Sequence, residues 1–218
     1  MTDEERLDWL KNFYQTFSYP INEFNLFGVR FDRDSKNKDK INDYLGYWMD
    51  DDIFITKGTT KPGVQYVNNP IEGTKGVFTL VEGKHEKVWS LGFHGVDPNS
   101  GRSGLARHKA LVNTKGVCKC TKGWRDINKN FVYDDKDVLV CGYYAVNFHN
   151  MGQINEAARV DIGKMSAGCQ VVRSRKDFEK IIKKFEETEN YKTNKKYATV
   201  DYVLFKSTEV PSGFVTAY

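Results

Sequence analysis

The chain has 218 residues, of which 39% are hydrophobic and 28% are charged, and its net charge is +4 at neutral pH. This composition is typical of a globular protein with a sizeable core and excludes the collagen-like, low-complexity and disordered classes. Basic and acidic residues are interleaved, so we expect no nucleic-acid partner. The sequence contains no apolar run long enough to span a bilayer.

The first predicted element is a helix over residues 2–18. Thr2 and Glu5 have the spacing of a capping box, and Pro20 ends the helical pattern. Apolar side chains recur at helical spacing and predict one buried face, made of Leu7, Leu10, Phe13, Tyr14 and Phe17. We interpret residues 1–45 as an N-terminal helical extension and residues 46–218 as the main domain.

Short β-branched or aromatic runs, separated by glycines, predict a series of strands after the extension. They cover residues 52–56, 77–81, 87–93, 109–113, 138–149, 170–172, 198–206 and 213–217. A second helix is predicted over residues 174–189, with Ser174 as its N-cap. The sequence therefore predicts a mainly β fold of the α+β class, with a sandwich or barrel-like sheet and two peripheral helices.

The segment around Cys169 carries the chemistry of an acyl-transfer site. A cysteine attacks an acyl carbon when a nearby imidazole takes its proton, and His149 ends the predicted strand 138–149. We expect the two side chains within hydrogen-bond reach. The amides of Gly168 and Cys169 are then expected to face the developing oxyanion, while Ser166 holds the turn. From these residues alone, a core cysteine and a surface histidine are the favoured interpretation.

The arrangement of His149, Ser166, Gly168 and Cys169 resembles the L,D-transpeptidase (YkuD-like) catalytic domain. The form Ser-Ala-Gly-Cys-Gln at 166–170 resembles a divergent, often phage-encoded branch, as do segments 59–63, 88–94 and 125–128. The resemblance covers roughly residues 50–175. Ala167 stands where the family has a histidine, and Val171 where many members have an arginine. These departures bear on the substrate and the outcome of the reaction more than on the nucleophile.

The resemblance implies a YkuD-like fold, bacterial peptidoglycan as the partner and no cofactor. Cys169 is then the nucleophile and His149 the base, while His94, Gln170 and Arg173 are the expected substrate-binding residues. Hydrolysis of stem peptides, by an L,D-carboxypeptidase or endopeptidase, and transpeptidation both remain open. A non-catalytic wall-binding or structural phage protein is the alternative of another class.

The start of the chain is acidic and lacks the apolar segment of a secretory signal. We therefore expect a protein made in the cytoplasm that reaches the wall after release or as part of a virion. This favours hydrolysis in a phage lysis or virion protein over cross-linking. The sequence does not predict the oligomeric state.

Two further groups of residues have simpler expected roles. We expect Cys118, Cys120 and Cys141 to be plain strand cysteines, although an even count of four permits disulfides. His85 and His108 lie in charged stretches and are expected to face solvent.

The residues Asp126, Asn128 and Asn130, followed by Asp134 and Asp137, have the spacing of oxygen ligands in a calcium loop. Phe131, however, occupies the position at which such a loop needs glycine. A polar hairpin turn is therefore the favoured interpretation, and we expect no metal.

Overall fold

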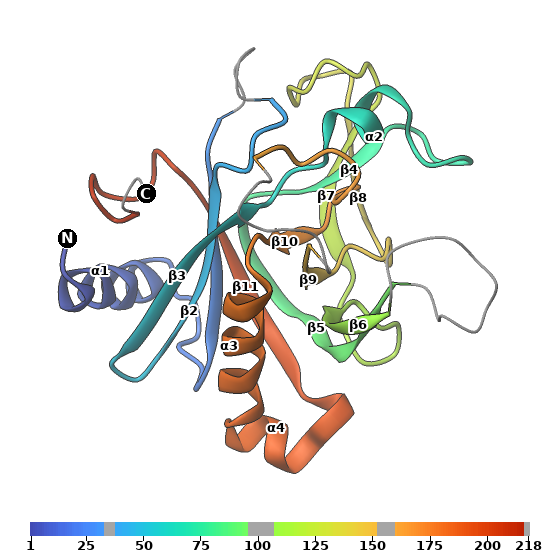
Figure 1. The fold of residues 1–218 in the computed structure, drawn as a ribbon. Coiled ribbons are helices and arrows are strands. Elements are labelled where there is room, and N and C mark those ends of the chain that lie inside the picture. Colours follow the sequence, from blue (N-terminus) through green and yellow to red (C-terminus); the bar gives the residue numbers. More distant parts are fainter. Residues whose placement is uncertain (33–37, 96–106, 152–159, 216–218) are drawn as a thin grey trace.

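The computed structural model describes residues 1–32, 38–95, 107–151 and 160–215. The fold is mainly β with a few helices, which confirms the predicted α+β class (Figure 1). In chain order the elements are α1 (Asp3–Thr16), β1 (Asn25–Arg30), β2 (Asp43–Met49), β3 (Asp52–Thr59), α2 (Val64–Asn68), β4 (Val77–Leu80), β5 (Gly83–His94), β6 (His108–Val112), β7 (Thr121–Asp126), β8 (Val138–Gly142), β9 (Phe148–Asn150), β10 (Gln170–Val172), α3 (Arg175–Glu186), α4 (Glu189–Asn194), η2 (Lys195–Tyr197) and β11 (Thr199–Lys206).

Eight strands form a closed barrel in the order β1-β11-β5-β6-β9-β10-β3-β2. Two of its pairings are parallel: β1 with β11, and β9 with β10. The other barrel pairings are antiparallel. A separate three-stranded sheet has the order β4-β7-β8. The barrel agrees with the expected barrel-like sheet, and its parallel pair β9–β10 positions the candidate site.

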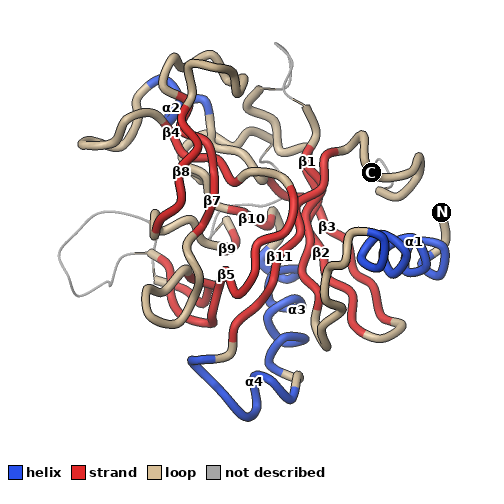
Figure 2. The backbone as a smooth tube through the Cα atoms, turned by 180° about the vertical axis from the view of Figure 1, so that it is seen from behind, coloured by secondary structure: helices blue, strands red, loops and turns tan. Residues whose placement is uncertain are grey.

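Strand β11 shows how the two faces of the barrel wall are used. Tyr202 and Leu204 belong to the main core cluster together with the apolar face of α3. Val203 and Phe205 point to the opposite face, where they pack in a second cluster with α1. Both views place α1 outside the barrel, beside β2 and β3, and α3 on another side of the wall (Figures 1 and 2). Leu7, Leu10 and Tyr14 of the predicted apolar stripe are therefore buried against the outer face of the barrel, whereas Phe17, after the end of α1, is exposed.

The predicted elements agree with the structure at α1 and α3, whereas the short helices α2 and α4 and the strand β7 were not predicted and several other strands differ. Thr2 forms the expected capping box of α1, and Ser174 caps α3. The single strand expected over 138–149 is divided into β8 and β9, and Ala145 between them has a φ of 54°. Residues 213–215 form turns and bends instead of a strand, and residues 216–217 lie outside the described part of the chain.

Strands β1 and β2 were not predicted from the sequence. Both are buried along almost their whole length on both faces. Burial on both faces removes the alternation of polar and apolar residues that marks a strand in a sequence. The expected boundary at residue 45 falls inside β2, and β1 is a barrel strand. The first 45 residues thus supply barrel wall in addition to a helix.

Within the described residues, no helix combines the length and the apolar composition needed to cross a bilayer.

Candidate active site

The parallel pair β9–β10 brings the two main candidates to neighbouring positions. His149 is the register partner of Val171, two residues after Cys169. The backbone amide of Gln170 donates to the carbonyl of Asn147 at 2.8 Å, which extends the pairing to the start of both strands. Adjacent strand ends therefore hold the histidine and the cysteine, as the sequence predicted.

The turn before Cys169 is shaped by Ser166 and Gly168. The Ser166 hydroxyl donates to the carbonyl of Cys169 at 2.8 Å and accepts from the amide of Gly168 at 3.1 Å. Gly168 has a φ of 120°, and a Cβ there would lie 2.3 Å from the carbonyl oxygen of Phe78. Ser166 holds the turn as expected. The Gly168 amide, expected to face an oxyanion, is instead engaged by Ser166.

His149 is fully buried and its tautomer is fixed by the backbone. Its Nδ1 lies 2.7 Å from the carbonyl oxygen of Asn150. A carbonyl can only accept, so Nδ1 carries the proton and Nε2 keeps its lone pair. Nε2 is buried and has no hydrogen-bond partner. Burial, with a smaller effect from neighbouring His94, lowers the pKa of His149 to about 3.

Cys169 is buried, and its thiol interacts with the backbone. Its Sγ accepts from the amide of Asn147 at 3.4 Å and lies 3.7 Å from the carbonyl oxygen of Ala145. Burial raises the pKa of Cys169 to about 11, against the smaller lowering effect of the Asn147 amide. His149 Nε2 has no hydrogen-bond partner, and Nδ1 is directed to Asn150. In the described part of the chain, His149 and Cys169 therefore do not form the expected hydrogen bond. The resting pair is a neutral thiol and a neutral imidazole.

Three histidines form a cluster at this site. The ring of His94 stacks on that of His149 with a centroid distance of 4.2 Å, and His108 lies 5.7 Å from both. Burial, followed by the effect of His108, lowers the pKa of His94 to about 4. The structure thus brings His94 to the site, as predicted. His108 was expected to face solvent, but it is only partly exposed because β5 pairs it with His94.

Asn147 connects the cluster to the thiol and was not predicted as a site residue. Its Oδ1 accepts from the amide of Asn113 at 3.3 Å, which directs its Nδ2 toward Nδ1 of His94 at 3.1 Å. Its own backbone amide faces Cys169 Sγ. Proximity to His149 in the sequence was the only signal that pointed to it.

Gln170 lies differently from an expected substrate contact, and the role predicted for Arg173 stays a prediction. Gln170 is fully buried; its Nε2 donates to the carbonyl of Gly168 at 3.3 Å, and its Oε1 accepts from the Tyr202 hydroxyl at 2.9 Å. These contacts fasten the turn to β11, so in this structure Gln170 supports the site from inside the barrel. The backbone amide of Arg173 donates to the carbonyl of Lys57 at 2.9 Å, just after β10, and its side chain is half-buried.

Two expectations are wrong: that the remaining cysteines are plain strand cysteines, and that His85 faces solvent. Cys120 and Cys141 form a disulfide, so they are not plain strand cysteines, and Cys118 lies in a turn before β7. His85 is buried, with Nε2 2.8 Å from the carbonyl oxygen of Val81. A local charge pattern does not reveal that β5 packs this side chain against β11.

The segment that resembles a calcium loop folds as a polar turn between β7 and β8. The Asp126 carboxylate accepts from the amides of Asn130 and Phe131. The side-chain amides of Asn128 and Asn130 both donate to Asp134. Its polar groups are thus directed at one another, and within the described ranges no group of three or more histidine, cysteine or acidic residues is arranged to hold a metal ion.

Comparison with known proteins yields no relative. A scan against protein-family models gives no match, and searches of the curated proteins and of the solved structures give none either.

Proposed function

We propose that this protein is a cysteine acyl-transfer enzyme with a YkuD-like fold that acts on the stem peptides of bacterial peptidoglycan. The observation that supports it most is the parallel β9–β10 pair: Cys169 directly precedes β10, and β9 carries the buried His149, whose Nε2 lone pair is unengaged. The resemblance of the segment around Ser166, Gly168 and Cys169 to the L,D-transpeptidase motif supplies the substrate class.

In the proposed reaction Cys169 attacks the carbonyl carbon that links an L-centre to a D-amino acid. The thiol proton passes to Nε2 of His149 as the new carbon–sulfur bond forms. The Nδ1–H bond to Asn150 keeps Nε2 as the accepting nitrogen. The tetrahedral intermediate then expels the amine, which leaves with the proton from His149, and a thioester remains on Cys169.

Burial keeps both groups neutral before substrate binds, so proton transfer has to accompany the attack. The backbone amide of Asn147, 3.4 Å from Sγ, is placed to stabilise the negative charge that develops on sulfur. Because Ser166 engages the Gly168 amide, the amide of Cys169 is the remaining candidate for the oxyanion. Ser166 and Gln170 act by keeping the turn in place.

The thioester has two possible acceptors. Attack by water, with His149 again taking a proton, gives an L,D-carboxypeptidase or endopeptidase. Attack by the amine of a second stem gives a transpeptidase. We favour hydrolysis, as in a phage lytic or virion-associated enzyme, because the segment 166–170 resembles the branch of the family that is often phage-encoded.

One observation favours a second candidate function, a wall-binding protein without catalysis. The Cys169 thiol is buried and makes no hydrogen bond to His149. Such a site is inert unless the substrate changes its environment.

Mass spectrometry of defined tetrapeptide stems and cross-linked muropeptides tests the proposal. The parent is expected to release the terminal D-residue or cleave an L,D bond, and Cys169→Ala to release nothing. Cys118→Ala, which removes the other free cysteine, is the matched control and is expected to behave like the parent. Exchanged or cross-linked products would indicate transpeptidation. A folded, reduced parent that yields no product from any stem would favour the wall-binding function.

A further inference from the structure

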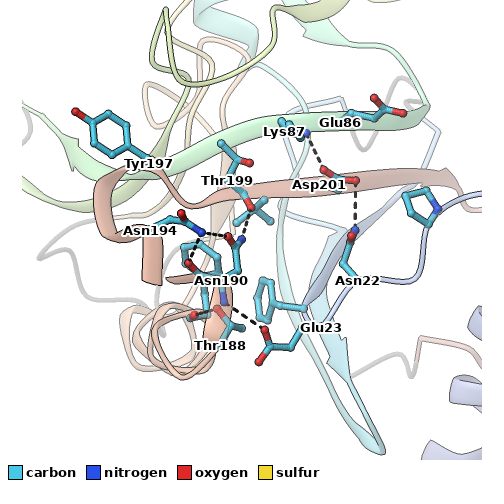
Figure 3. Close-up of a pocket in the computed structure, with 14 residues that line it drawn as sticks. Asn22, Glu23, Glu86, Lys87, Thr188, Asn190, Asn194, Tyr197, Thr199 and Asp201 are labelled. Carbon is cyan, nitrogen blue, oxygen red and sulfur yellow. Dashed lines mark hydrogen bonds between the residues drawn. The ribbon is translucent and has the colours of Figure 1, made fainter. Parts of the chain in front are cut away.

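A cavity lies away from the histidine cluster, between α4, η2 and the strands β5 and β11 (Figure 3). Its volume is about 590 Å³, within the range of about 300–1,000 Å³ that small-molecule pockets occupy. Fourteen residues line it: Pro20, Asn22, Glu23, Phe24, Glu86, Lys87, Phe185, Thr188, Asn190, Asn194, Tyr197, Thr199, Val200 and Asp201.

The polar wall of this cavity is held in place by its own hydrogen bonds. Asp201 accepts from the backbone amide of Lys87 at 2.7 Å and from Nδ2 of Asn22 at 3.3 Å. On the opposite side, Nδ2 of Asn194 donates to Oδ1 of Asn190 at 3.0 Å (Figure 3). In both Asn22 and Asn194 the side-chain Nδ2 is therefore used within the protein. The Oδ1 atom of each side chain is the one that can accept a hydrogen bond from a ligand. The wall is therefore preorganised for hydroxyl groups.

The apolar part of the cavity consists of a buried floor and an exposed rim. Phe24 and Phe185 are buried, with ring centroids 5.6 Å apart, and Val200 is buried beside them. Tyr197 lies at the rim, and 63% of its surface is exposed, the largest fraction among the exposed large hydrophobic residues that the structure describes. Nζ of Lys196 lies over one face of this ring, 5.1 Å from its centroid, so the opposite face is the one available for stacking beside the amides.

The charges around the cavity are close to balanced. Three carboxylates, of Glu23, Glu86 and Asp201, line it together with Lys87. Lys84 and Lys119 both pair with Glu86 and lower its pKa to about 2, so this carboxylate is charged and already neutralised. A surface without excess positive charge gives a phosphate or a free carboxylate no electrostatic advantage, and it suits a neutral ligand rich in hydroxyl groups.

From these features we infer that the cavity is a binding site for a neutral oligosaccharide, with Tyr197 as the stacking platform and Asn22 and Asn194 as hydroxyl-binding residues. Sugar hydroxyls both donate and accept, which matches side-chain amides, and the apolar face of a sugar ring packs on an aromatic ring.

The cavity and the proposed active site share strand β5. Lys87 lies at the cavity and His94 in the histidine cluster, seven residues apart, or roughly 23 Å at 3.3 Å per residue. Resting on the proposed function, this inference makes the cavity a subsite for the glycan of the same wall polymer whose peptide reaches Cys169.

Calorimetric titration of the full chain with neutral trisaccharides tests the inference. The protein carries Cys169→Ala so that no turnover accompanies binding, and the probes are the trisaccharide of N-acetylglucosamine and cellotriose. Binding of the acetylated sugar alone would indicate wall glycan as the source, and binding of both would indicate a general hexose site. Both outcomes support an oligosaccharide site.

Variants of the rim residue give the sharper test. Tyr197→Ala is expected to weaken binding by about tenfold, equivalent to about 1.4 kcal/mol, whereas Tyr197→Phe keeps the ring and should bind like the parent. Ile71→Ala, at another exposed apolar residue, is the matched control. No binding of either sugar at millimolar concentration, equal binding by Tyr197→Ala, or tighter binding of an anionic trisaccharide would overturn the inference.

The inference and the proposed function can fail separately. Cleavage of a glycan-free stem peptide depends on Cys169 and not on Tyr197. Sugar binding without peptide cleavage would support the oligosaccharide site and contradict the proposed enzymatic activity. Peptide cleavage without sugar binding would support the enzymatic activity and contradict the oligosaccharide site.

Discussion

Gly168 shows how closely the candidate site depends on single residues. Its φ of 120° is unfavourable for any residue with a Cβ, and the added atom would clash with the carbonyl oxygen of Phe78. The glycine and its neighbours Ser166 and Cys169 were predictable because their chemistry appears in the local sequence. Asn147 and His108 were not, because their roles arise from strand pairings that bring them beside His94.

We predict that Gly168→Ala lowers the free energy of unfolding by at least about 1–3 kcal/mol, the cost of a strained backbone conformation. Gly73→Ala is the control, because Gly73 also has a positive φ but a Cβ added there would have no atom within 4 Å. Urea denaturation of both variants measures the difference. Equal losses would show that the contact with Phe78 contributes nothing.

His149 makes stability depend on pH. Its folded-state pKa of about 3 lies below the value of about 6.5 for an unfolded histidine, so the unfolded chain binds the proton more tightly. The free energy of unfolding is therefore at its full value above about pH 6.5, where His149 is neutral in both states. It decreases as the pH falls toward 3, because the unfolded chain takes up the proton first. Below the unfolded pKa the slope approaches about 1.4 kcal/mol per pH unit.

We therefore expect His149→Gln to lose stability less steeply than the parent between about pH 6.5 and 4, because its unfolded state takes up one proton fewer. Urea midpoints across this range measure the slope. A variant with the parent's slope would mean that His149 is protonated as readily in the folded protein as in the unfolded chain.

At the scale of elements, the prediction succeeded best for the two long helices, each of which has one exposed face. The helices α1 and α3 carry caps and an apolar stripe, and both were found. Strands β1 and β2 lack alternation because both faces are buried. The division of 138–149 into β8 and β9 follows from tertiary pairing, since β8 joins the small sheet and β9 the barrel.

The disulfide between Cys120 and Cys141 joins the ends of the β7–β8 hairpin across 21 residues. Closing a loop of this length stabilises a fold by about 3 kcal/mol. We predict that Cys120→Ser with Cys141→Ser lowers the unfolding free energy by about this amount, as measured by urea denaturation without reductant. In Cys118→Ser the disulfide should remain and stability should stay close to the parent's. An unchanged double variant would show that the hairpin is held by its strand pairing alone.

At the scale of the whole molecule, α1 and the barrel share one apolar cluster. Leu10 is completely buried in it beside residues of β1, β2 and β11. The helix was predictable from its own residues, but its partner surface was not, because that surface combines β1 and β2, which were not predicted as strands, with the distant β11. The proposed extension over residues 1–45 therefore makes a testable claim about cooperativity.

We predict that Leu10→Ala destabilises the entire chain by about 2–5 kcal/mol and that helix and barrel still unfold together. Circular dichroism and tryptophan fluorescence should give one shared transition in urea. Leu139→Ala, at a residue that is 42% exposed, should shift it by less than about 0.5 kcal/mol. An early loss of helical signal alone would instead identify the extension as a separate unit.

The parallel pairing of β1 with β11 has a consequence for the order of events during synthesis. The first and last barrel strands are neighbours, with Leu26 opposite Tyr202 and Arg30 opposite Lys206. While the ribosome is still adding residues, the wall therefore has two unsatisfied edges, on β1 and on β5, and the cysteine turn lacks Tyr202 as its anchor. Contacts of such long sequence separation form slowly. Until β11 has been synthesised, the nascent chain thus exposes unpaired strand edges that can associate with other chains. The need for chaperones should be greatest just before β11 emerges.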